Sequence, residues 1–140
     1  MRRLSVFPLD VPEELSAKAD EVWWELRALS TKDKRFLVAT KNFLQQQNVY
    51  QPRAELDPAS AIILGRLLDA DAVMAVYLKD RTLYMGVYES KYGRPLWVQE
   101  MTLQPSIPIL EQLGPAASKL ARSFVSTIPY QGFVTLDPLN

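Results

Sequence analysis

The most constraining feature of the sequence is a short, almost entirely apolar run, AVMAVYL, at positions 72–78. The run lies between Asp71 and Lys79 and is far shorter than the roughly 20 apolar residues that cross a bilayer. Its length is typical of a strand, and because apolar side chains occupy both alternating positions, both faces of that strand must be covered. The run therefore predicts a central strand with helices on both sides of its sheet, which is an α/β architecture.

A helix is expected directly before this strand, in the segment LDPASAIILGRLLDAD at 56–71. Asp57 is placed to cap its first turn, and Pro58 takes the first helical position, where a missing N–H costs nothing. Apolar side chains then recur at helical spacing and form a broad arc that predicts a helix lying flat on a sheet: Ile63, Leu64, Leu67 and Leu68.

The residues after the strand predict a hairpin. Apolar and polar side chains alternate over 78–103, and KDR at 79–81 and SKYGR at 90–94 have the composition of turns between antiparallel strands. A sheet that combines this hairpin with strands joined through helices must be mixed.

The N-terminal third predicts two strand-to-helix steps. A strand at 3–9 leads into a helix for which Asp10 is the expected cap, with Glu13 three residues later. A second strand at 35–40 is followed by a short helix at 41–47.

The C-terminal third predicts one long helix and a last strand. Helical spacing over 106–129 is interrupted by Gly114-Pro115, where we expect a kink or a break, and YQGFVTL at 130–136 predicts a final short strand. The whole chain, 1–140, is therefore predicted to be a single α/β domain with a mixed sheet of five to six strands and helices packed against it.

The composition argues against catalysis and against nucleic-acid binding. Sixteen basic and sixteen acidic residues cancel, so no global field attracts nucleic acid. The chain has no cysteine and no histidine, so it lacks a thiolate nucleophile and the side chain most used for proton transfer near neutral pH. We therefore expect a protein that is not an enzyme, with no cofactor, no nucleic-acid partner and no integral membrane span.

Two pairs of carboxylates are candidate sites. Asp69 and Asp71 flank one residue and could in principle hold Mg²⁺ or Ca²⁺, but at a helix-to-strand corner a solvated helix end and a turn cap explain them more simply. Glu55 and Asp57 are likewise explained by the positive end of a helix dipole rather than by an acid–base pair. No metal site is predicted.

Taken in order, the segments resemble a known family. RRLSVFPLD, RFLVATKNFL, ELDPASAIILGRLLDADAVMAVYLKD and a hairpin ending YGRPLWVQEMTL are similar to the N-terminal domain of TolB and its relatives, which include CsgG, FlgO, PelC and LpoB. In that family a helix ending in Leu-Gly-x-x-Leu-x-Ala-Asp leads straight into a strand. The matching residues here are Leu64, Gly65, Leu68, Ala70 and Asp71, while Gly93 and Trp97 match the end of the family hairpin.

The resemblance implies a setting in the bacterial cell envelope, in the periplasm or at the inner face of the outer membrane. It also implies a non-catalytic role, with another envelope protein or a second copy of the chain as partner. Two departures limit the transfer: VYLKD replaces the family's usual glycine after the strand, and no cysteine is present for lipidation. Because Asp10 ends the first apolar run, no signal-peptide core is present, and we expect the signal peptide to be missing from this sequence.

Aromatic residues give the candidate partner-binding sites. Tyr84 and Tyr88 alternate on one strand face with Gly86 between them, and Trp97 on the returning strand is expected to join them across the hairpin. Trp24 lies on the side of its helix opposite the apolar stripe, among charged residues. Each aromatic has two open interpretations, which are packing within the chain or exposure for a partner.

The sequence therefore predicts a protein-interaction or assembly module of a bacterial envelope system, acting as an adaptor or scaffold without catalysis. The alternative is a ligand-binding module, with a glycan as one candidate ligand, that uses the aromatic face of the hairpin.

Overall fold

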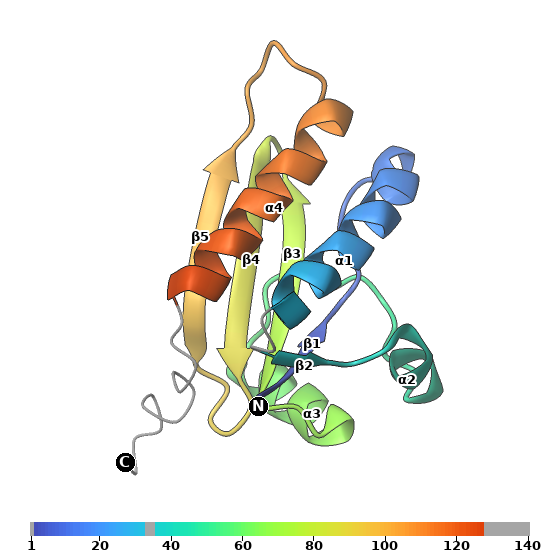
Figure 1. Cartoon of the computed structure of the whole chain (residues 1–140), viewed down its shortest axis with the longest axis vertical. Coiled ribbons are helices and arrows are strands. Elements are labelled where there is room, and N and C mark those ends of the chain that lie inside the picture. Colours follow the sequence, from blue (N-terminus) through green and yellow to red (C-terminus); the bar gives the residue numbers. More distant parts are fainter. Residues whose placement is uncertain (1, 33–35, 128–140) are drawn as a thin grey trace.

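The chain folds into a mixed sheet with helices on both faces, as a computed structural model of residues 2–32 and 36–127 shows (Figure 1). The strands in these residues are β1 (Arg2–Val6), β2 (Phe36–Val38), β3 (Ala72–Lys79), β4 (Thr82–Glu89) and β5 (Pro95–Thr102). The helices are the 3-10 turn η1 (Glu13–Leu15), α1 (Ser16–Thr31), α2 (Lys41–Gln46), α3 (Pro58–Leu68) and α4 (Ile109–Thr127). Across the sheet the strands lie in the order β2-β1-β3-β4-β5.

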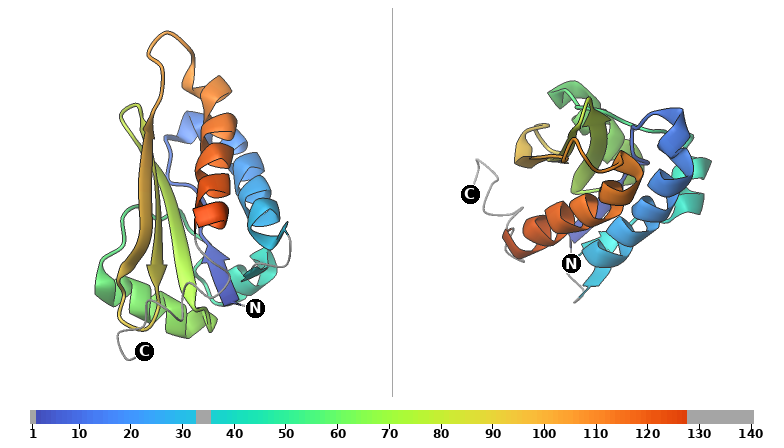
Figure 2. Two further views of the ribbon diagram at one scale, coloured as in Figure 1. Left: turned by 60° about the vertical axis from the view of Figure 1, so that its left-hand side comes forward. Right: turned by 90° about the horizontal axis from the view of Figure 1, so that it is seen from above.

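The connections divide the sheet into a parallel half and an antiparallel half. β1 pairs in parallel with β2 and β3, whereas β3, β4 and β5 form an antiparallel meander. α1 and α4 lie side by side on one face, and α3 lies across the lower end of the other face (Figure 2). We call these the helical face and the open face. The predicted α/β class, mixed sheet and hairpin are confirmed, while the strand predicted at 130–136 lies outside the described residues.

The core lies between the sheet and the helical face. The expected apolar stripe of α1 is largely buried, and Trp23 joins it by donating its indole N–H to the carbonyl of Val6 over 2.8 Å. In α4, the ring of Phe124 stacks on the ring of Phe36 in β2, with the ring centroids 5.4 Å apart. Ser118 of α4 donates its hydroxyl to Glu25 of α1 over 2.7 Å, so a polar contact also fixes the two helices to each other.

The predicted helix cap at Asp10 is wrong. The first turn is η1, which Pro12 precedes with no side-chain cap, and α1 begins at Ser16. Asp10 instead extends the line of β1 along β3, because its N–H donates to Val76 and its carbonyl accepts from Leu78. A backbone that is needed for sheet pairing cannot also bend into a capping turn.

Two helices differ in part from expectation. α3 begins at Pro58 with Asp57 accepting from the N–H of Ser60 over 2.7 Å, as predicted, but Ile63 and Leu67 are exposed. Half of the apolar arc therefore faces away from the sheet. At Gly114-Pro115 the prediction was a kink or a break, and the break does not occur, because α4 is one helix over Ile109–Thr127 with Pro115 inside it.

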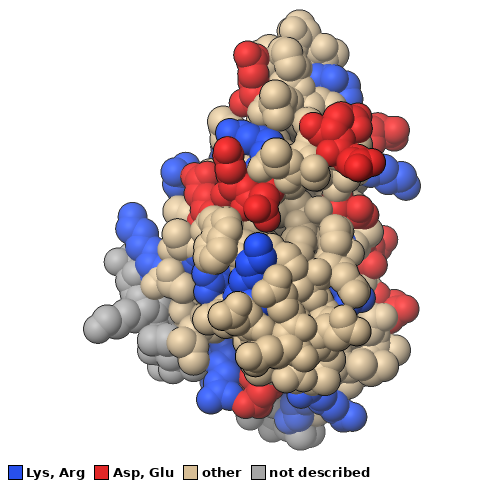
Figure 3. All heavy atoms as spheres, turned by 90° about the vertical axis from the view of Figure 1, so that its right-hand side faces the viewer, with Lys and Arg blue, Asp and Glu red and all other residues tan. Residues whose placement is uncertain are grey.

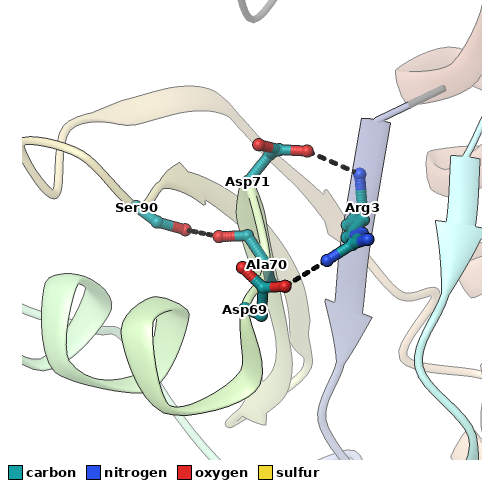
Figure 4. A network of polar contacts seen from close by, with 5 residues as sticks. All are labelled: Arg3, Asp69, Ala70, Asp71 and Ser90. Atoms are coloured by element: carbon teal, nitrogen blue, oxygen red, sulfur yellow. Dashed lines mark hydrogen bonds and ion pairs between the residues drawn. The ribbon is translucent and has the colours of Figure 1, made fainter.

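The motif that carries the family resemblance forms a structural corner (Figure 4). Gly65 packs so closely on the end of β4 that a Cβ atom there would lie 2.3 Å from the Cβ and Oγ of Ser90. Ser90 in turn donates its hydroxyl to the carbonyl of Ala70 over 2.6 Å. The glycine of the motif is therefore explained by a close approach of helix and strand.

Both aspartates of the motif bind Arg3. Asp69 ends α3 with a left-handed φ of 50° and pairs through its carboxylate with the guanidinium of Arg3. Asp71 accepts the backbone N–H of Arg3 over 2.8 Å and donates its own N–H to the Arg3 carbonyl over 2.9 Å. The two carboxylates therefore tie α3 and β3 to β1.

Candidate tyrosine surface

Three tyrosines gather on the open face of the sheet, above α3. Tyr77 of β3 pairs directly with Tyr84 of β4, and their rings are stacked with centroids 4.9 Å apart and an angle of 10° between their planes. Tyr88 lies four residues further along β4, on the same face as Tyr84. With Gly86 and Val98 of β5, which pair with each other, these residues form what we call the tyrosine surface.

Gly86 makes room for Tyr88. A Cβ atom at Gly86 would lie 2.7 Å from the hydroxyl of Tyr88 and 3.0 Å from its ring, so the ring extends along the strand over the glycine. Any side chain at position 86 would displace that ring. The spacing Tyr-x-Gly-x-Tyr is thus a packing device, and it leaves Tyr88 buried while Tyr84 and Tyr77 are half-buried.

A hollow of about 230 Å³ lies beside the tyrosines, closed below by the start of α3 and by the β4–β5 turn. Val98, with half of its surface exposed, lines its outer side, and Glu55 contributes a carboxylate. Burial raises the pKa of Tyr77, and the negative charge of Glu55 raises it further. Burial also raises the pKa of Tyr88, against the opposing effect of a backbone hydrogen bond at Leu56. Both hydroxyls therefore stay neutral and able to donate a hydrogen bond at physiological pH.

The expectation that Trp97 joins these tyrosines is wrong. Trp97 pairs with Val87, so its side chain points to the helical face, where its ring lies 5.6 Å from that of Phe124. It is 8% exposed. Tyr77 takes the place beside Tyr84 that sequence reasoning had assigned to Trp97. The signal for Tyr77 was present in the run AVMAVYL, where it alternates with Val73 and Ala75.

Trp24 lies away from the tyrosine surface, on the outer side of α1. Its side chain is 48% exposed, its ring meets that of Trp23 edge-on at 4.9 Å, and the guanidinium of Arg27 lies over both rings. On this side of the molecule acidic and basic groups are mixed over the upper part, and the lower part is largely uncharged with basic groups near its edge (Figure 3). Exposure of Trp24 agrees with its place opposite the apolar stripe, and a role in binding stays a prediction.

A second hollow, of about 320 Å³, lies on the open face between α2 and the end of α3. Its lining is largely apolar and includes Phe43 and the exposed Leu37, together with Ser5. The Ser5 hydroxyl is buried and has no hydrogen-bond partner. Sequence reasoning missed this hollow because it forms between three segments that are distant in sequence, 3–5, 37–43 and 68–70.

The described residues contain neither a metal-binding cluster nor a membrane-spanning helix. No group of three or more aspartate, glutamate, histidine or cysteine side chains is arranged to hold a metal ion in residues 2–32 and 36–127. No helix within the same residues has the length and apolarity to cross a membrane.

The strand order, the paired helices on one face and the single helix across the other define a class of α/β domain, and solved structures of that class resemble this chain. The C-terminal domain of LpoB from Escherichia coli superposes with a TM-score of 0.54 at 18% identity, over 74% of this chain and 82% of that one. Lipoprotein GNA1162 from Neisseria meningitidis gives 0.50 at 12% identity, over 92% of this chain and the whole of that one. TolB from Acinetobacter baumannii gives 0.51 at 13% identity, over 91% of this chain and 29% of TolB.

These similarities confirm the TolB-like resemblance at the level of the fold. No protein-family model and no curated protein sequence matches the chain.

Proposed function

We propose that the chain is a non-catalytic protein-interaction module of a bacterial cell envelope, and that it binds its partner through the tyrosine surface. One observation carries the proposal: half-buried Tyr77 and Tyr84 and half-exposed Val98 flank a hollow on the part of the open face that α3 leaves uncovered. Aromatic side chains with polar tips around a hollow are typical of the centre of a protein–protein interface.

The fold supports the envelope setting. Two of the similar structures are named as LpoB and as a lipoprotein, and a third is TolB. We therefore propose the periplasm or the inner face of the outer membrane as the location, and another envelope protein as the partner. Self-association through the same surface is the competing possibility.

The stacking of the tyrosines favours a protein over a glycan. A sugar ring packs on the free face of an aromatic ring, but Tyr77 and Tyr84 each cover one face of the other. The neutral hydroxyl of Tyr77 and the carboxylate of Glu55 suit the donors and acceptors of a peptide.

The test is site-specific photo-crosslinking in the native host. We would place p-benzoylphenylalanine at Val98 and, as a matched control, at Leu110, which is equally exposed but lies on α4. We expect one discrete crosslinked partner from position 98, weakened by Tyr84→Ala, and none from position 110. Equal crosslinking from both positions, or a position 98 product unaffected by Tyr84→Ala, would rule out the tyrosine surface as the binding site.

A further inference from the structure

The two edges of the sheet are protected to very different degrees. At one edge, β2 has three residues, and Arg27 of α1 donates to the carbonyls of Val38 and Ala39 at its end over 3.3 and 3.0 Å. A strand of three residues with one of its carbonyls already bonded to an arginine side chain is a poor template for another strand. At the other edge, β5 has eight residues.

Backbone groups of β5 point outward from the sheet. The N–H of Leu103 donates to the carbonyl of Arg81 over 2.7 Å, which fixes the alternation of the β4–β5 ladder. Positions that bond to β4 recur at every second residue, so Met101 and Gln99 bond to β4 as Leu103 does. The residues between them, Val98 and Glu100, therefore direct their N–H and C=O groups away from β4. No described residue pairs with this outer side.

The topology disfavours a further parallel strand of the same chain at this edge. β1, α1 and β2 form a crossover on the helical face that moves away from β5. β5 is parallel to β1, and α4 lies on the helical face beside α1. A right-handed crossover through α4 would therefore also run in the direction from β1 toward β2, and the position next to β5 on that side is already filled by β4. Crossovers of parallel strands are right-handed in about 98% of cases. A parallel strand on the outer side of β5, reached through α4, would therefore require the rare left-handed form.

Hollows flank β5 on both faces of the sheet. On the open face is the hollow of the tyrosine surface, lined by Val98 near the middle of the strand. On the helical face a hollow of about 370 Å³ lies between α4 and the upper part of β5, lined by Met101 and Leu103 among others. Side chains of a strand point alternately to the two faces, so a strand added beside β5 would send side chains toward both hollows.

We propose that the outer edge of β5 accepts an extended segment of a partner protein as a sixth strand. This inference rests on the proposed function and specifies how the partner binds. Glu100 is exposed on the open face, two residues from Val98, and an opposite charge directly across favours pairing. The partner segment therefore carries a lysine or arginine opposite Glu100 and an apolar residue two positions away, opposite Val98. A second copy fits less well, because no residue of β5 is basic.

The probe is a phage-displayed library of random peptides, selected on the immobilised full-length protein, followed by synthesis of the most enriched peptide. We expect enriched sequences that alternate and place a basic residue two positions from an apolar one. Glu100→Pro removes an outward N–H without touching the bonds to β4, so it should weaken binding by about tenfold or more. Glu100→Gln keeps the N–H and removes the charge, and should weaken binding by about threefold.

Hydrogen exchange of the unmodified protein provides a test that does not depend on a variant. Bound peptide should slow exchange at the amides of Val98 and Glu100. The inference is overturned if no peptide is enriched, if protection appears elsewhere, or if Glu100→Pro binds as the wild type does. Protection of these amides without peptide would also overturn the inference, because the edge would then be filled already. Protection that grows with protein concentration would identify a second copy as the occupant, and protection independent of concentration would identify the chain's own terminus.

A crosslinked partner at position 98 that persists in Glu100→Pro would overturn strand addition while leaving the proposed function intact.

Discussion

Gly65→Ala tests the close approach between α3 and the β4–β5 hairpin. In the wild type a Cβ at this position would lie 2.3 Å from the side chain of Ser90 and 3.3 Å from its Cα. Ser90 must therefore move, and its 2.6 Å hydrogen bond to the carbonyl of Ala70 is lost. Overpacking costs about 1–3 kcal/mol, and the lost hydrogen bond costs about 1 kcal/mol. Alanine gains back about 1 kcal/mol of helix propensity.

The expected result is a net destabilisation of about 1–3 kcal/mol, or a fall of roughly 3–10 °C in Tm. Urea unfolding followed by circular dichroism measures it. Ser90→Gly is the matched variant because it removes the atoms that the new Cβ would meet. In that background Gly65→Ala should cost nothing or stabilise the protein through its helix propensity.

The double-mutant cycle isolates the contact from the general effect of each substitution. A Gly65→Ala protein as stable as the wild type would refute the close-approach explanation of the motif glycine. The explanation would also be refuted if Gly65→Ala lowered the free energy of unfolding equally in the wild type and in the Ser90→Gly background.

Three further predictions concern single side chains. Trp24→Ala should leave Tm nearly unchanged, whereas Trp23→Ala should cost about 3–5 kcal/mol in urea unfolding because its buried ring and its bond to Val6 are lost; equal costs would contradict the assigned burial. Ser5→Ala should raise the free energy of unfolding by about 1 kcal/mol, because it removes a buried hydroxyl with no partner, and a loss of stability would reveal an unseen partner. Hydrogen bonds from Ser60 lower the pKa of Asp57 below its ordinary value of 3.8, so its charge stabilises the fold above that pH and this contribution is lost as pH falls through the lowered pKa. The stability difference between wild type and Asp57→Asn should therefore shrink on acidification from pH 6 to pH 3, and a constant difference would exclude the charge as its cause.

Local chemistry made several elements predictable from sequence. Asp57 and Pro58 specify the start of α3 through groups within one turn, and the two turns of the meander follow from short polar segments between alternating strands. The central strand follows from apolar residues at every position from 72 to 76, all of them buried.

The features that failed depend on partners distant in sequence. Asp10 has the local pattern of a cap, but Val76 and Leu78 take its backbone groups. Trp97 was assigned to the wrong face because a hairpin shifted by one residue exchanges the two faces of a strand. That register is fixed by the turn and by an irregularity at Val87/Tyr88, neither of which composition reveals. The tyrosine surface was therefore only half predictable: Tyr84 and Tyr88 were named, and Tyr77 was not.

The contact of Arg27 with the end of β2 bears on how far any assembly can extend. A sheet that accepts strands at both edges can add molecule after molecule and grow into a fibre. At the edge opposite β5, the guanidinium of Arg27 already bonds the carbonyl of Val38. Under the proposed strand addition, β5 is then the edge that accepts a partner, and we expect one partner segment per domain. Replacing Arg27 would therefore remove a contact between α1 and the end of β2 and also expose the β2 edge to strand addition.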